Sequence, residues 1–137
     1  MADSIREQII QAFATRISAQ RSGQVSVEQP LPARAVWDLA ESSERTSFGK
    51  LENTLTLSVG IMDRVDMQLN NSVQANGLLA ELLDDALNQD ATLGDLCERI
   101  NYTGSTIDYP APGQSEMAVL AEFEIVYRTS SRTPYQK

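Results

Sequence analysis

MAVLAEFEIVYRT, residues 117–129, has the alternation of a long β-strand. Its odd positions, from Met117 to Tyr127, are apolar. Its even positions include Glu122, Glu124 and Arg128. Successive side chains of a strand point to opposite faces, so this spacing makes one apolar and one mostly polar face. We therefore expect a central strand that is covered on one side, with Leu120 and Val126 of the other face packing against a neighbouring element or subunit.

Residues 53–67 show the clearest alternation in the chain and predict a second long strand. Its apolar side should align with that of the 117–129 strand, which it pairs with directly or through a neighbour. Gly60 indicates a bulge or a close backbone approach. Shorter strands are expected at residues 35–40 and 102–109. Trp37, in the first of these, is interpreted as a core or strand-packing residue rather than as an anchor for a partner.

Two amphipathic helices are predicted from spaced apolar residues. The first begins with a capping box at Ser4 and Glu7. The second is capped by Asn71 or Ser72 and carries a leucine stripe that should dominate the core. A short third helix is expected from Thr92. Together these elements predict an α+β fold, in which a mixed, mainly antiparallel sheet has two main helices packed on one face.

The composition is that of one globular domain, residues 1–137, able to bury a core without disulfides or metals. The apolar runs are too short for a transmembrane helix, and residues 1–15 lack the layout of a secretion signal. Cys97 is the one cysteine, cannot form an internal disulfide, and is interpreted as a buried helix residue. The formal net charge of −8 repels nucleic acid and anionic membranes at long range.

Little in the chain supports catalysis. It has no histidine and no phosphate-binding glycine loop. Glu122 and Glu124 share a strand face, where they could bridge a metal in a small acidic enzyme such as a nuclease. Only two lysines, Lys50 and Lys137, are available to assist such chemistry. We therefore expect no enzyme, no catalytic residues, no cofactor and no metal.

Two motifs carry a family resemblance. Residues 90–94 contain an acidic D-x-T-L-G turn, and residues 126–129 read VYRT. In this order, after a leucine-rich helix, they resemble the tail terminator proteins of long-tailed phages, the family of the lambda-like minor tail protein U. The resemblance covers most of the chain and is strongest over residues 78–135.

The resemblance implies a structural virion protein with a compact α/β fold. Such proteins form a hexameric ring at the head-proximal end of the siphovirus tail. The ring stops polymerisation of the tail tube, and it offers a surface to the head–tail connector protein for head–tail joining. Its partners would be further copies of the chain, the tail tube protein, the connector, and genomic DNA that passes through the lumen without sequence-specific binding. Assembly would take place in the host cytoplasm, with no membrane involved.

Candidate interface residues follow from the polar segments. Residues 41–52 predict a projecting loop or β-arm, and residues 130–137 a short polar tail. The candidates on the arm are Arg45, Phe48 and Lys50, which could reach a neighbouring subunit or the tube. Those on the 117–129 strand are Glu122, Glu124 and Arg128, which could form ion pairs between subunits. A head–tail connector or a tube protein is the second structural interpretation, and the metal-dependent enzyme is a third.

Overall fold

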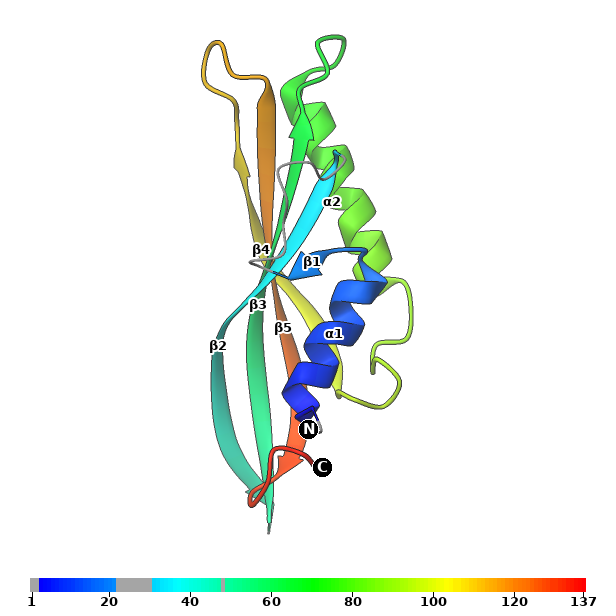
Figure 1. The fold of residues 1–137 in the computed structure, drawn as a ribbon, viewed down its shortest axis with the longest axis vertical. Coiled ribbons are helices and arrows are strands. Elements are labelled where there is room, and N and C mark those ends of the chain that lie inside the picture. Colours follow the sequence, from blue (N-terminus) through cyan, green and yellow to red (C-terminus); the bar gives the residue numbers. More distant parts are fainter. Residues whose placement is uncertain (1–2, 22–30, 48) are drawn as a thin grey trace.

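The computed structural model describes residues 3–21, 31–47 and 49–137. In this part of the chain, two helices and five strands form an α+β fold (Figure 1). The helices are α1 (Ile5–Arg16) and α2 (Asn71–Leu87). The strands are β1 (Gln20–Arg21), β2 (Ala33–Ser47), β3 (Lys50–Arg64), β4 (Arg99–Asp108) and β5 (Glu116–Ser130). The predicted α+β class with a mixed, mainly antiparallel sheet is therefore confirmed.

The sheet has the order β1-β2-β3-β5-β4. β1 and β2 are parallel, and every other pair is antiparallel. β5 lies between β3 and β4, so the strand predicted at residues 117–129 is internal, and it pairs directly with the second long strand. β2 reaches Ser47, well beyond the end predicted at residue 40, because residues 41–47 continue the pairing with β3.

One face of the sheet, called the inner face here, carries the core. Alternate residues of β3 and β5, such as Leu57 and Phe123, are fully buried there. They share one cluster with buried residues of α1 and α2. Phe13 of α1 meets Phe123 edge to face, with 5.3 Å between the ring centroids. Figure 1 shows both helices on the right of the sheet.

The helix starts differ in detail from the predicted ones. Ser4 caps α1 as expected, accepting a hydrogen bond from the Glu7 amide, but the Glu7 carboxylate binds Arg21 rather than completing the capping box. Asn70 caps α2, one residue before the predicted cap, and its side chain accepts from the Ser72 amide at 2.8 Å. Asparagine is a strong capping residue because its short side chain reaches the free amides of the first turn.

The prediction of a short third helix from Thr92 is wrong. Residues 91–96 form turns, with positive φ at Leu93, Gly94 and Asp95. The Asp90 carboxylate accepts hydrogen bonds from the Thr92 amide and hydroxyl and from the Gly94 amide. Three consecutive left-handed residues cannot continue a right-handed helix, so the cap-like sequence makes a closed turn instead.

Candidate assembly surfaces

The outer face of the sheet, opposite the helices, carries four partly exposed apolar side chains. They come from β2, β3 and β5, with relative exposures between 38% and 56%: Trp37, Leu39, Met62 and Leu120. Gly60 lies in the same region, paired with Leu120, and a Cβ on it would approach Trp37 Cζ3 to 3.0 Å. Gly60 thus marks a close approach, and Trp37 packs on the strands from outside rather than in the core.

We call these four side chains the outer apolar patch. Sequence alternation assigned Leu120 to this face but could not show that residues from three strands meet there. The strand register shows that they do. Gly60 of β3 pairs with Ala35 of β2 on one side and with Leu120 of β5 on the other, so the three strands are aligned at Gly60. Trp and Met, two of its members, are enriched in protein interfaces.

The two sides of the sheet are open in the described part of the chain. Among the described residues, β1 pairs with β2 only at Ala35 and Val36, and no described strand pairs with the other side of β2 from Trp37 to Ser47. β4 forms the opposite side, and β5 is the one described strand that pairs with it. Unpaired strand edges present free amides and carbonyls to any other chain that can align with them.

Residues 41–47 and 50–52 form a β-ribbon rather than a loop, and this ribbon is not free on both sides. β5 continues along β3 as far as the pair Lys50–Ser130. The C-terminal segment folds onto the same end, because the Ser131 amide donates to the Gly49 carbonyl at 2.8 Å. The Ile5 amide donates to the Pro134 carbonyl at 2.9 Å, which ties the segment to the start of α1.

The structure brings four of the six candidate residues to one face. By strand register, Lys50, Glu122, Glu124 and Arg128 share the outer face of β3 and β5. Arg45 pairs with Leu51 beyond the bulge in β2 and therefore lies on the inner face, exposed past the helices. Phe48 lies outside the described residues.

Two of these candidates already have partners within the chain. Arg128 forms ion pairs with Glu52 at 3.8 Å and Glu98 at 3.9 Å. The Lys50 ammonium donates to the Lys137 carbonyl at 2.6 Å. The side chains of Glu122 and Glu124 bind no partner within the described ranges, and no group of three or more His, Cys, Asp or Glu residues there could hold a metal ion.

An ionic network that the sequence pattern did not indicate joins α1 to β2. Arg6 donates to Asp38 at 2.9 Å and lies 3.8 Å from Glu41. The hydrogen bond from Arg6 lowers the pKa of the Asp38 carboxyl. The hydrogen bond from Arg21, at 2.7 Å, lowers the pKa of Glu7 in the same way. No periodicity could have found these contacts, because they join residues on separate elements.

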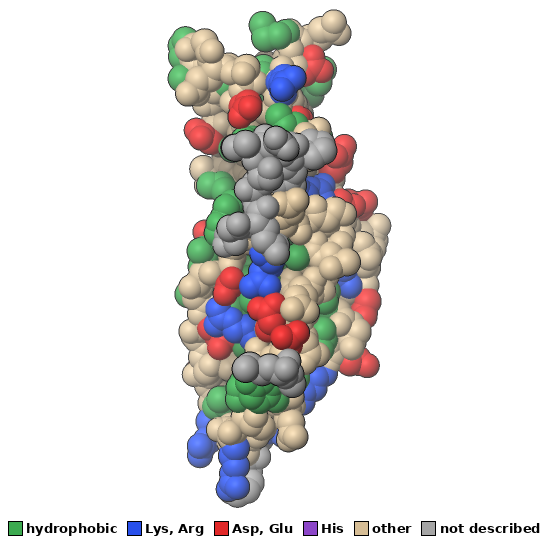
Figure 2. Space-filling model, in the orientation of Figure 1, with side chains coloured by type: hydrophobic (Ala, Val, Ile, Leu, Met, Phe, Trp, Pro, Cys, Tyr) green, Lys and Arg blue, Asp and Glu red, His purple; other side chains and the backbone are tan. Residues whose placement is uncertain are grey.

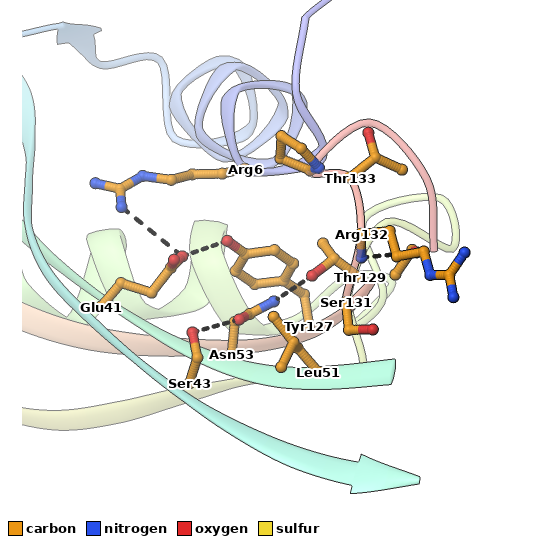
Figure 3. A pocket seen from close by; sticks show the side chains of 12 residues that line it. Arg6, Glu41, Ser43, Leu51, Asn53, Tyr127, Thr129, Ser131, Arg132 and Thr133 are labelled. Carbon is orange, nitrogen blue, oxygen red and sulfur yellow. Dashed lines mark hydrogen bonds and ion pairs between the residues drawn. The ribbon is translucent and has the colours of Figure 1, made fainter. Parts of the chain in front are cut away.

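An open pocket of about 290 Å³ lies beside this network, between the ribbon and the C-terminal segment (Figure 3). Several of its polar groups bind one another. The Tyr127 hydroxyl donates to Glu41, and burial together with this bond raises the pKa of Tyr127. Asn53 joins Ser43 to Thr129 across the floor. We interpret these contacts as structural, since the groups that make them are already occupied by one another.

Comparison with known proteins gives no independent assignment: no protein-family model matches the chain, and no curated protein matches it. A search of the described helices found none long and apolar enough to cross a membrane.

Proposed function

We propose that this chain is a structural subunit of a phage tail, the tail terminator, which closes the head-proximal end of the tail tube as a hexameric ring. The outer apolar patch is the observation that carries the proposal. The helices cover only the inner face, and Trp37, Leu39, Met62 and Leu120 remain partly exposed on the other. Exposed apolar groups that cluster on one face mark surfaces for protein partners.

The open sides of the sheet support the same conclusion. A ring needs two different surfaces on each subunit, because each copy contacts one neighbour with one surface and the next neighbour with the other. In the described part of the chain, β2 beyond Val36 and β4 each have one unpaired side, and these sides, at opposite edges of the sheet, would supply such a pair. The family resemblance is the reason for assigning this ring to a phage tail.

The decisive experiment is negative-stain imaging of particles from cells that express the phage genes with and without this chain. Loss of the chain should give tails of uncontrolled length that do not join heads. Tails of normal length beside unjoined heads would instead assign the chain to the head–tail connector. Normal infectious particles without the chain would refute a structural role and return attention to Glu122 and Glu124.

A surface variant tests the patch itself. Leu120→Asp places a charge in the patch at a side chain that is 43% exposed, so the fold should survive while tail capping is lost. Met67→Asp is the matched control, because it places the same charge at an exposed apolar residue outside the sheet. Tail capping that persists in Leu120→Asp would show that the patch is not the contact surface.

A further inference from the structure

The positive charge of this acidic chain is concentrated in two short segments. Residues 44–52 and 128–137 hold five of the eleven Lys and Arg residues, but only two of the 19 Asp and Glu residues, Glu44 and Glu52. The five are Arg45, Lys50, Arg128, Arg132 and Lys137. They include both lysines of the chain. We call them the basic end.

The fold brings these two segments together. The Ser131 amide donates to the Gly49 carbonyl, and the Lys50 ammonium donates to the Lys137 carbonyl. Figure 2 shows the resulting group of Lys and Arg side chains at the lower end of the molecule. Arg45 and Arg132 are exposed, and neither guanidinium has a partner in the part of the chain that the structure describes. These two cations are therefore available to another molecule.

A surface of opposite charge lies along α2 and the turns after it. Residues 65–98 contain no Lys or Arg. Six exposed carboxylates lie there: Asp66, Glu81, Asp84, Asp90, Asp95 and Glu98. We call Glu81, Asp84, Asp90 and Asp95 the acidic side, because Asp66 precedes α2 and Glu98 is paired with Arg128. Asp85 is left out because it binds Arg34 at 2.7 Å. In Figure 2 acidic side chains follow the right side of the molecule, over α2 and the turns below it.

We propose that the basic end of one copy docks onto the acidic side of the next copy. This inference rests on the proposed function, which requires repeated contacts between copies. It adds the orientation of that contact: end to side, so that one interface uses two different surfaces. Heterologous contacts of this kind build closed rings when the rotation between copies closes. Complementary charge speeds encounter and fixes the register of the two copies.

A second copy fits the basic end better than DNA does. The net charge of −8 repels a polyphosphate, and Glu44 and Glu52 stand among the five cations. The acidic side, in contrast, offers separate carboxylates from a segment that contains no Lys or Arg, and the two arginines that reach it from other elements, Arg16 and Arg34, bind the Ala86 carbonyl and Asp85. It is present on every copy at the same concentration as the basic end.

Carbodiimide cross-linking tests the contact directly, because this reagent joins amines to carboxylates with no spacer. Both lysines lie at the basic end, so every cross-link through a lysine reports on that end. An equal mixture of ¹⁴N- and ¹⁵N-labelled protein separates links between copies from links within one copy. We expect mixed-isotope peptides that join Lys50 or Lys137 to Glu81, Asp84, Asp90 or Asp95. Lys50→Arg keeps the charge and should lose only its own links.

Charge reversal tests whether the contact drives assembly. Arg45→Glu with Arg132→Glu, and separately Glu81→Lys with Asp84→Lys, should each weaken self-association by on the order of tenfold or more. An equal mixture of the two variants should recover it, because each altered surface then meets an altered partner. Raising salt from about 0.1 M to about 1 M shortens the screening length from about 10 Å to about 3 Å and should weaken the wild type.

Sedimentation velocity measures the association, and circular dichroism confirms that each variant is folded. The proposal is overturned if the wild type gives no cross-links between copies, if the links map elsewhere, or if the charge-reversed variants assemble like the wild type. It is also overturned if a fluorescent DNA duplex binds the wild type, loses binding in Arg45→Glu with Arg132→Glu, and competes with self-association. None of these results bears on tail length, so the imaging experiment above judges the terminator function separately.

Discussion

Asn53 provides the sharpest test of the packing at the ribbon. Its side chain is 3% exposed and lies on the inner face beyond the helices. Its amide donates to the Thr129 hydroxyl at 2.9 Å, and its carbonyl accepts from the Ser43 hydroxyl at 2.6 Å (Figure 3). Thr129 is itself buried, whereas Ser43 is exposed. Asn53→Ala therefore leaves one buried hydroxyl without its donor and one exposed hydroxyl that can turn to water.

The expected loss follows from this difference. An unsatisfied buried polar group costs about 1–3 kcal/mol, so Asn53→Ala should lower the free energy of unfolding by that amount. For a domain of this size each kcal/mol corresponds to about 3–5 °C in melting temperature. Ser43→Ala is the matched control, and it should stay within about 0.5 kcal/mol because surface substitutions generally do.

Urea denaturation followed by circular dichroism, at one fixed protein concentration, measures these differences. Thr129→Val and the double variant with Asn53→Ala complete a double-mutant cycle. Since either single change orphans the other partner, the double variant should lose less stability than the sum of the two, by about 1 kcal/mol. Additive losses, within about 0.5 kcal/mol, would refute the hydrogen bond as a source of stability.

Three further predictions concern α2 and the turn after it. Leu82→Ala should lower the free energy of unfolding by about 2–5 kcal/mol because this side chain is fully buried, whereas Leu83→Ala should cost less because Leu83 is only partly buried. Equal losses in urea denaturation would contradict this orientation of α2. Three hydrogen bonds from the turn lower the pKa of Asp90 to about 2. Their stabilising contribution is present above the unfolded pKa of about 3.9 and is lost as the pH falls toward 2. In Asp90→Asn the melting temperature should therefore fall less steeply than in the wild type as the pH is lowered from about 4 to 2. An unchanged dependence of melting temperature on pH would contradict this role of Asp90. Burial raises the pKa of the Cys97 thiol to about 11, so the folded protein should react with a disulfide reagent far more slowly than the urea-unfolded chain. Equal rates would show that the thiol is accessible.

The helices and long strands could be predicted because their signals are local. The leucine stripe that predicted α2 and the alternation that predicted β3 and β5 repeat over many residues, and each repeat places apolar groups on one face. The prediction failed at Thr92, where three side-chain and backbone hydrogen bonds to Asp90 favour a turn over a helix. Those bonds leave no periodic pattern in the sequence.

The candidate surfaces were predictable only in part. Alternation placed Glu122, Glu124 and Arg128 on one strand face, and strand register agrees. It could not show that Arg128 is already paired with Glu52 and Glu98. Nor could it place Arg45 on the face opposite Lys50, because a bulge in β2 between Asp38 and Ala40 reverses the alternation of the strand.

The sequence by itself determined the fold class, the burial of one face of the long strands, and the excess of negative charge. These depend on residue type and on spacing within single elements. Only the tertiary structure decided that Trp37, Leu39, Met62 and Leu120 form one patch, and that the C-terminal segment joins the ribbon to make the basic end. Both surfaces arise because segments that are distant in the sequence lie side by side in the fold. Strand register and the path of the C-terminal segment decide which residues meet, and a pattern within one element does not contain that information.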